Sequence, residues 1–241
     1  MGAPRAIALC QCFSGALDFQ VGNWEAAERD LRAAAALYRT ISAASGEALS
    51  LQRLGVLLTA RGRLDEAVAA LDEGLIVAER AIMRSHCLTR LQASLARNRL
   101  AADDVGGAVE AIATGDLHAA RHGYCVTCNA LLLPEAVRVA LRLGQVDEAD
   151  ARARALEGAA AEFGSKAWTA MARTARGRVD AASGRVEAGA RALAEARAAW
   201  EAVDASYEAA RCASEEASLT ADEPLGMQAR STFARLGGAG G

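Results

Sequence analysis

The sequence predicts an all-α protein, a right-handed α-solenoid of about six stacked antiparallel helical hairpins with a period of about 40 residues. Three observations support this fold. Alanine, arginine, leucine and glutamate dominate the chain and only three prolines interrupt it, so helix propensity is high nearly everywhere. A turn motif recurs at a nearly constant spacing. Small residues stand at fixed distances on both sides of that turn.

The recurring turn is visible in segments such as RGRLDEA and LGQVDEA, and each copy has an anchor residue where the chain is predicted to reverse. Successive anchors are 40, 41, 41, 40 and 40 residues apart. The anchors are Gly22, Gly62, Asp103, Gly144, Gly184 and Pro224. Each repeat is therefore predicted to be a helix, a tight turn at the anchor and a second antiparallel helix, with the first helix over residues 3–21.

The residues around each anchor predict where the two helices of a hairpin touch. Seven residues before the anchors stand Gly15, Gly55, Ala96, Val137, Gly177 and Ala217. Five residues after them stand Ala27, Ala67, Ala108, Ala149, Gly189 and Ala229, and nine after them Leu31, Leu71, Ile112, Ala153, Leu193 and Phe233. Small residues let two helices approach closely, and the larger apolar ones fill the space beside the contact.

The repeats extend along nearly the whole chain, which bears on domain organisation. A single hairpin cannot bury its apolar stripe, whereas six stacked hairpins can. We therefore expect one helical-repeat domain over residues 1–236. The glycines of residues 237–241 predict a flexible tail.

Charge and hydropathy narrow the classes of function. The net charge of −3 over 241 residues gives no overall field to attract nucleic acid. No apolar run approaches the roughly 18 residues of a membrane span, and the start MGAPRA lacks the basic character of a signal peptide. We expect a cytoplasmic protein whose six cysteines are reduced thiols or metal ligands. Lysine occurs only at Lys166, a bias typical of GC-rich bacterial genomes.

Residues 54–81, LGVLLTARGRLDEAVAALDEGLIVAERA, resemble a tetratricopeptide repeat (TPR). The matching positions are Leu54, Gly55, Gly62, Leu64, Ala67, Leu71 and Gly74. The 40-residue period is longer than the usual 34 of that family, which implies longer helices or linkers. The chain is also similar to the repeat regions of bacterial transcription regulators of the LuxR and MalT type. The resemblance implies a scaffold for a protein or peptide partner, and the regulatory repeat region of such a regulator.

The same resemblance implies that the first helices of the hairpins line a concave groove, where arginines recur. Three of these arginines, Arg97, Arg138 and Arg178, each stand six residues before an anchor in three successive repeats. Because each guanidinium offers a planar bidentate fork, such a row suits the carboxylates of an acidic partner. The alternative is that these arginines pair with neighbouring glutamates or face solvent. The predicted partner-binding groove consists of Arg90, Arg97, Arg138, Arg142 and Arg178, with Leu100 and Leu141 on its floor.

A second candidate site lies in residues 118–128. The two histidines are four residues apart and share a helix face, and the two cysteines are three apart across the start of the next helix. Two imidazoles and two thiolates satisfy a tetrahedral zinc site. His86 or Cys87 of the preceding repeat can replace one ligand. The predicted ligands are His118, His122, Cys125 and Cys128.

Other interpretations of these cysteines stay open. A Cys-x-x-Cys motif at a helix start lowers the pKa of a thiol and suits redox chemistry. Equally, both cysteines can be small apolar residues at a tight helix contact. For Cys10, Cys12 and Cys212 we expect packing alone. A pocket for a small effector near Pro134 and Trp168 is a further alternative.

Catalytic motifs are missing from the sequence. Its three histidines all lie within residues 86–122, no serine–histidine–acid arrangement can be proposed, and the glycine-rich segments lack phosphate-loop spacing. We therefore predict a non-enzymatic scaffold that binds a protein or peptide. The alternatives are a metal- or thiol-responsive sensor and a small-molecule effector-binding domain.

Overall fold

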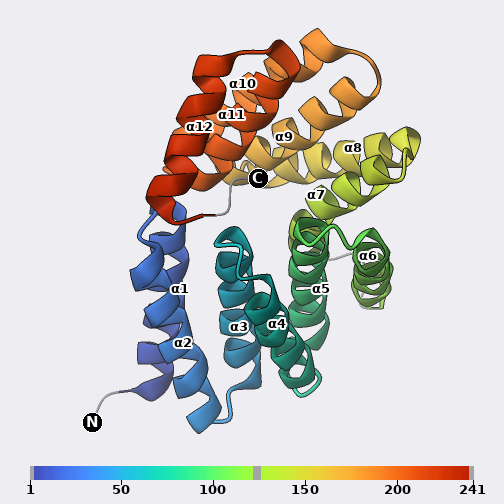
Figure 1. Ribbon diagram of the computed structural model, residues 1–241. Coiled ribbons are helices and arrows are strands. Elements are labelled where there is room, and N and C mark those ends of the chain that lie inside the picture. Colours follow the sequence, from blue (N-terminus) through green and yellow to red (C-terminus); the bar gives the residue numbers. More distant parts are fainter. Residues whose placement is uncertain (1–2, 122–125, 239–241) are drawn as a thin grey trace. The chain divides into compact units, whose positions relative to one another are not determined.

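A computed structural model describes residues 3–121 and 126–238. Within these ranges the chain forms twelve α-helices and no strand, and helices adjacent in sequence pair into hairpins (Figure 1). No helix in these ranges combines the length and apolar character that crossing a bilayer requires. The predicted all-α fold of helical hairpins is confirmed. The helices are α1 (Pro4–Val21), α2 (Trp24–Thr40), α3 (Ala44–Ala60), α4 (Leu64–Ala78), α5 (Arg84–Ala101), α6 (Val105–Ala120), α7 (Val126–Arg142), α8 (Val146–Phe163), α9 (Lys166–Ala182), α10 (Val186–Glu201), α11 (Ser206–Thr220) and α12 (Glu223–Leu236).

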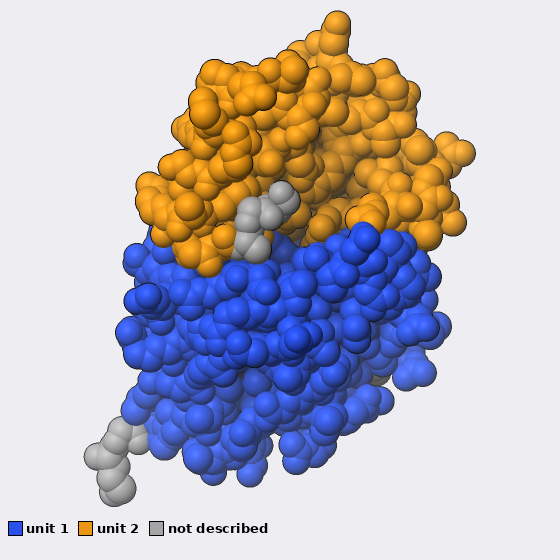
Figure 2. Space-filling model, in the orientation of Figure 1, with its two compact units in different colours: residues 1–132 blue, residues 133–241 orange. Residues whose placement is uncertain are grey.

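The chain divides into two compact units, residues 1–132 (unit 1) and residues 133–241 (unit 2), with the division inside α7 (Figure 2). In unit 1, α1 packs on α2, α3 on α4 and α5 on α6, and each hairpin contacts the next. In unit 2, α9 packs on α10 and α11 on α12, while α8 and α10 connect to the helices that follow them. The expectation of one domain over residues 1–236 stays a prediction.

The tight turns within the hairpins lie at the predicted anchors. Five anchors adopt the left-handed backbone conformation, which glycine enters without a steric cost and aspartate tolerates. In the first turn, the amide of Asn23 donates to the carbonyl of Asp18 and the amide of Gly22 to that of Phe19, a pattern that ends a helix. The φ angles are 95° at Gly22, 75° at Gly62, 60° at Asp103, 71° at Gly144 and 80° at Gly184.

The sixth turn is an exception to the predicted register. Here the left-handed residue is Ala221, with a φ of 56°, and Pro224 lies in the first turn of α12. Asp222 caps this helix by accepting a hydrogen bond from the amide of Leu225 at 3.0 Å. The prediction that Pro224 marks the turn was therefore wrong by three residues, because the fixed φ of proline suits the start of a helix. With Ala221 as anchor, Glu215 stands six residues before it.

The predicted contacts between paired helices are confirmed, since all residues of the three sets around the anchors are buried. At Gly55 an added Cβ would lie 2.5 Å from the side chain of Leu71, sixteen residues further along. At Gly177 it would lie 2.8 Å from Cγ of Leu193 and 3.0 Å from the carbonyl oxygen of Gly189. Glycine at these positions thus sets how closely the two helices of a hairpin pack.

The final helix ends in a glycine cap. Gly237 has a φ of 68°, its amide donates to the carbonyl of Ala234, and the amide of Gly238 donates to Phe233 at 2.9 Å. This arrangement satisfies carbonyls that would otherwise lack partners. The predicted flexible tail therefore begins with two residues that cap α12, and residues 239–241 lie outside the described part of the chain.

Candidate functional site

In unit 1 the first helices of successive hairpins, α1, α3 and α5, touch through polar side chains at a repeated register. Nη1 of Arg53 lies 3.1 Å from the carbonyl oxygen and 2.9 Å from Sγ of Cys12. One hairpin further along, Nε2 of Gln52 donates to Oγ of Ser94 at 2.6 Å. In both pairs, a residue ten before one anchor meets a residue nine before the next. We call the surface formed by these helices the first-helix face of unit 1.

Two arginines on this face are partly buried and uncompensated. The Arg53 guanidinium lies 4.7 Å from the ring centre of Phe13, and the Nε atom of Arg90 is buried without a hydrogen-bond partner. Burial and the neighbouring Arg53 charge lower the pKa of Arg90. Among the described residues, no carboxylate forms an ion pair with either arginine. These two guanidiniums therefore have the capacity to receive an anion from outside the chain.

Unsatisfied polar atoms gather on the same helices. Within the described ranges, every buried side-chain nitrogen or oxygen without a hydrogen-bond partner belongs to α1, α3, α5 or the part of α7 in unit 1. Buried polar atoms normally find partners because leaving them unpaired is costly. The set contains both donors and acceptors. Its members are Gln11, Gln52, Thr89, Arg90, Asn98 and Asn129.

Thiols influence the pKa of Arg90. Nδ1 of His86 lies 3.2 Å from Sγ of Cys128, which joins α5 to the first turn of α7. Cys128 and Cys87 both act to raise the pKa of Arg90, against the larger lowering by burial. Burial raises the pKa of Cys87 to about 11, and burial together with Arg90 lowers the pKa of His86. Both shifts favour the uncharged forms of the Cys87 thiol and the His86 imidazole.

The predicted zinc ligands are only partly described. His118 is half-buried on α6 and Cys128 is buried on α7, whereas His122 and Cys125 lie outside the described residues. Burial lowers the pKa of His118. Within the described part of the chain, no three or more His, Cys, Asp or Glu side chains converge on one point. The contact present is the one between His86 and Cys128, and the zinc site stays a prediction.

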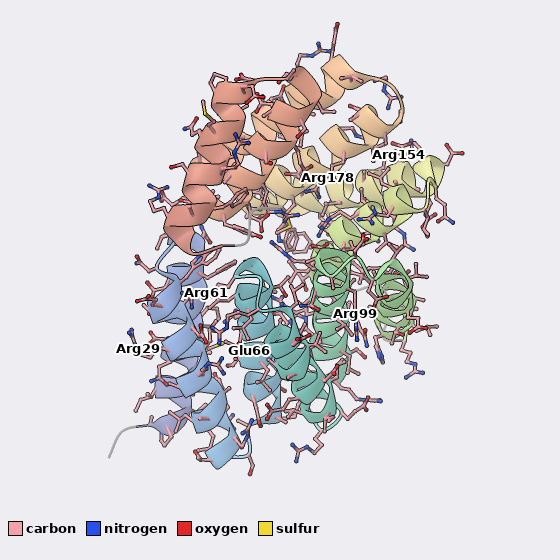
Figure 3. All side chains as sticks on the ribbon, viewed as in Figure 1. Arg29, Arg61, Glu66, Arg99, Arg154 and Arg178 are labelled. Atoms are coloured by element: carbon pink, nitrogen blue, oxygen red, sulfur yellow. The ribbon has the colours of Figure 1, made fainter. Side chains whose placement is uncertain are left out.

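In unit 2 the predicted groove arginines meet carboxylates of the chain itself. Nε and Nη2 of Arg178, labelled in Figure 3, lie 2.7 and 2.6 Å from the two carboxylate oxygens of Glu215, which joins α9 to α11. Burial by itself raises the pKa of Glu215, but the charge and hydrogen bonds of Arg178 outweigh it and hold the pKa below the usual value. Arg178 is thus held in a bidentate ion pair.

Further ion pairs extend this arrangement along unit 2. Nη1 of Arg138 lies 2.6 Å from Glu135 on α7, and Nη1 of Arg211 lies 2.9 Å from Glu208 on α11. The charge of Arg138 also helps to lower the pKa of Glu215. The first-helix side of unit 2 therefore carries arginines whose charge is already neutralised by neighbouring glutamates, the alternative that the sequence left open.

The other predicted groove residues are dispersed. Arg97 is partly buried and Arg142 is exposed. Leu100 is buried, and Leu141 packs against the core formed by α7, α8 and α9. Trp168 packs on the same core and lies against Phe163, with ring centres 5.1 Å apart and the ring planes tilted by 56°. The roles predicted for these residues in binding stay predictions.

Sequence reasoning missed Arg53. The anchor register contains the signal that identifies it, because Arg53 stands nine residues before Gly62, at the position where Ser94 contacts the preceding hairpin. The predicted groove was based on the arginines six residues before the anchors, and it did not include the position nine residues before them. Arg90 was among the predicted residues, but its neighbour across the helix contact was not.

Two solved structures are similar to this chain. The crystal structure of BtubC (BKLC) from P. vanneervenii has a TM-score of 0.57 and 15% identity, and covers 91% of this chain and 90% of that chain. The crystal structure of a kinesin light chain from Podosopora anserina with nearly identical TPR-like repeats has a TM-score of 0.51 and 21% identity, and covers 83% of this chain and 96% of that chain.

These likenesses bear on the fold alone, because the identities are low. They confirm that the chain has the TPR-like helical-repeat fold that residues 54–81 resemble. No family model and no curated protein matches the sequence. The narrower relation to LuxR- and MalT-type regulators receives no support from these structures.

Proposed function

We propose that this chain is a non-enzymatic TPR-like scaffold that binds an acidic segment of a protein partner on the first-helix face of unit 1. The observation that carries the proposal is the pair Arg53 and Arg90. Both side chains are partly buried on neighbouring first helices, and neither has a carboxylate partner in the described chain. A partly buried cation without a counter-charge costs stability, so it persists most readily where a ligand supplies the counter-charge.

The surroundings favour a peptide segment over an isolated anion. The Phe13 ring beside Arg53 is half exposed and offers apolar contact next to the charge. The two arginines then fix the segment by its carboxylates.

Narrower parts of the function rest on sequence alone. Arg97, Arg138 and Arg178 stay candidates for partner contacts, but a partner carboxylate at Arg138 or Arg178 must displace Glu135 or Glu215. The role as the regulatory region of a transcription regulator rests on the stated resemblance. A place in the cytoplasm rests on the lack of an apolar run of membrane length and of a basic leader in the sequence.

The test is fluorescence anisotropy with a labelled peptide rich in Glu-Glu pairs. We expect binding that weakens when NaCl rises from about 50 to about 300 mM, because salt screens the charges. The Arg53→Gln/Arg90→Gln double variant should bind about tenfold more weakly or worse. A peptide with glutamine in place of glutamate should fail to bind wild type.

The matched control is the Arg29→Gln/Arg154→Gln double variant, which removes the same charge from side chains that are 71% and 65% exposed (Figure 3). It should bind the acidic peptide as wild type does. Equal losses in the two double variants would show that net charge alone attracts the peptide. The proposal fails in that case, and also if wild type does not bind.

A second candidate function is a metal- or thiol-responsive sensor, which the 3.2 Å contact between His86 and Cys128 favours. This contact joins two first helices, so a metal bound there would alter how successive hairpins pack. Zinc should raise the melting temperature of wild type and leave that of a His86→Ala/Cys128→Ala double variant unchanged. Elemental analysis that finds no zinc, with no shift on its addition, would rule this function out.

A further inference from the structure

A cavity of about 190 Å³ lies in unit 2 between α10 and α12, with α11 beneath it. Because α11 contacts both of the other helices, the chain itself bounds the cavity on each side. The floor is apolar and consists of small buried side chains, those of Ala209, Ala210 and Ala213 on α11 and Ala229 on α12. A closed cavity of about 150 Å³ is enough to bind benzene, so this one has room for a single small ring.

The repeat register shows why space is left here. Ala213 stands eight residues before its anchor Ala221, and Arg197 on α10 stands thirteen residues after the anchor of the preceding hairpin. In unit 1 the same two positions hold Leu95 and Leu75, which both pack against one apolar core. Apolar side chains therefore fill in unit 1 the space that is open in unit 2.

Two further positions repeat this difference. Ser206 and Ala209 stand fifteen and twelve residues before the anchor of their hairpin, where unit 1 has Leu88 and Leu91. Both leucines are buried in the same apolar core. A serine or an alanine at these positions leaves open the volume that a leucine side chain would fill.

Elsewhere in unit 2 an ion pair occupies the corresponding place. Arg176 on α9 stands eight residues before its anchor. Its Nε atom lies 2.7 Å from Oε1 of Glu157 on α8, which stands thirteen residues after the preceding anchor. The long side chain of Arg176 thus spans the space that Ala213 leaves open on α11. The cavity is therefore a feature of the hairpin formed by α11 and α12.

The charged residues of the lining differ in their pairing. Nε of Arg197 lies 3.0 Å from Glu216, and its Nη1 lies 3.6 Å from Glu201. Arg235 is exposed on α12 and forms no ion pair within the described part of the chain. An anion that enters the cavity therefore meets in Arg235 a guanidinium whose charge no described glutamate or aspartate has neutralised.

Hydroxyl groups of the lining are also available. Ser206 and Thr232 are partly buried, and within the described ranges neither side chain has a hydrogen-bond partner. Thr174 and Thr220, in contrast, donate to carbonyl oxygens one turn earlier in their helices. A carboxylate accepts hydrogen bonds at both of its oxygens, so the Thr232 hydroxyl and the Arg235 guanidinium, one turn apart on α12, suit it.

We infer that this cavity binds a small monocarboxylic acid with an apolar body about the size of one ring. The apolar body covers the alanine floor and Leu225, and the carboxylate pairs with Arg235 and accepts a hydrogen bond from Thr232. A mainly apolar lining with a few polar groups that fix orientation is typical of small-molecule sites. This site shares no residue with the peptide-binding face proposed for unit 1.

The test is a titration of the full chain with benzoate, phenylacetate and 4-methylpentanoate, followed by NMR of the backbone amides. At least one of these acids should shift the amide signals of α11 and α12 with a Kd of about 1 mM or tighter. Ala213→Leu should abolish these shifts, because it supplies the side chain that Leu95 has at the same position. The uncharged amide of the acid that binds should bind about tenfold more weakly.

The matched pair of charge variants is Arg235→Gln and Arg230→Gln. Arg230 is exposed on the same helix but does not line the cavity. Arg235→Gln should weaken binding about tenfold, and Arg230→Gln should leave the Kd unchanged. Equal affinities of the two variants would contradict the role of Arg235.

The inference is overturned if none of the three acids shifts these signals at about 10 mM, or if Ala213→Leu binds as wild type does. Circular dichroism should show that Ala213→Leu keeps the helical fold. If it unfolds, Thr232→Leu narrows the cavity from α12 and should have the same effect. The Arg53→Gln/Arg90→Gln variant should bind the acid as wild type does. A loss of binding there would place the acid on the first-helix face of unit 1 and would likewise overturn the inference.

Discussion

Arg53 and Arg90 of unit 1 and Arg138, Arg178 and Arg211 of unit 2 all stand on first helices of hairpins, but only those of unit 2 have a carboxylate partner in the described part of the chain. In unit 2, Arg138, Arg178 and Arg211 each pair with a glutamate of the chain. In unit 1, Arg53 and Arg90 have no carboxylate partner among the described residues: Arg53 contacts the carbonyl and thiol of Cys12, and the charges that raise the pKa of Arg90 are those of thiols.

This difference separates two uses of a recurring arginine. Where a glutamate stands within reach on the next first helix, the arginine joins hairpins and its charge is cancelled, as with Arg178 and Glu215. Where no described carboxylate forms an ion pair with the arginine, as at Arg53 and Arg90, the guanidinium keeps its charge at a cost in stability. The partly buried arginines without a carboxylate partner are therefore the better candidates for ligand binding.

The largest effect on the free energy of unfolding should come from breaking the ion pair between Arg178 and Glu215 in unit 2. In Glu215→Ala the partly buried Arg178 loses its bidentate partner, and we expect the free energy of unfolding to fall by about 3 kcal/mol. Urea unfolding of the full chain followed by circular dichroism measures this loss.

The control for that variant is Glu187→Ala, in which the removed carboxylate is 96% exposed and lies 4.0 Å from Arg191. Its loss should change the free energy of unfolding by less than about 0.5 kcal/mol. If Glu215→Ala proves equally mild, the ion pair with Arg178 does not contribute to the stability of unit 2.

A smaller loss of stability should follow in both units when a glycine at the contact between paired helices is replaced by alanine, because both units have glycine at such a contact. Gly55→Ala and Gly177→Ala each force a methyl group against a buried leucine, and each should cost about 2 kcal/mol of unfolding free energy. Gly158→Ala is the control, since an added Cβ there meets nothing within 4 Å. Equal stability of Gly158→Ala and the other two variants in urea would contradict the close helix approach.

A gain in stability of about 1 kcal/mol should follow when Arg90 is replaced by methionine, because the substitution removes an uncompensated, partly buried charge and keeps much of the volume. The same substitution at exposed Arg29 should change stability by less than about 0.5 kcal/mol. Thermal unfolding measures both. A clear loss of stability in Arg90→Met would mean that Arg90 is compensated after all.

The smallest effect concerns pH. The pKa of Glu215 lies below its value of 4.5 in the unfolded chain, so below neutral pH the unfolded state binds this proton before the native state does. Stability from Glu215 is therefore present above about pH 4.5 and is lost as pH falls further. The difference in unfolding free energy between wild type and Glu215→Gln should shrink between pH 6 and pH 3.5, and a constant difference would contradict the shift.

The sequence predicts the repeat well because its signals are local. Five anchors need a left-handed residue, and glycine or aspartate stands at each of them. The sixth was misplaced because the constant spacing was extended to Pro224, although Asp222 followed closely by proline is itself a helix start. Because of that error, Glu215 was not recognised as the equivalent of Arg97, Arg138 and Arg178. Only the corrected register places it at their position, six residues before the anchor.

The candidate site was harder to predict, because charge compensation depends on contacts about 40 residues apart. Nothing local to Arg178 shows that Glu215 pairs with it, and nothing local to Arg53 shows that Cys12 takes that place. A residue's neighbours across hairpins follow from the register only when every anchor is correct. The sequence could therefore identify Arg90 as a candidate but not its companion.

The most direct test of the difference between the units is the NMR spectrum of the arginine Nε–Hε groups, recorded while a peptide rich in Glu-Glu pairs is added to the full chain. The Nε–Hε signals of Arg53 and Arg90 should shift with the peptide concentration, while those of Arg138 and Arg178 stay in place in their ion pairs. Shifts confined to Arg138 and Arg178, or no shift at Arg53 and Arg90, would contradict the assignment of the binding site to unit 1.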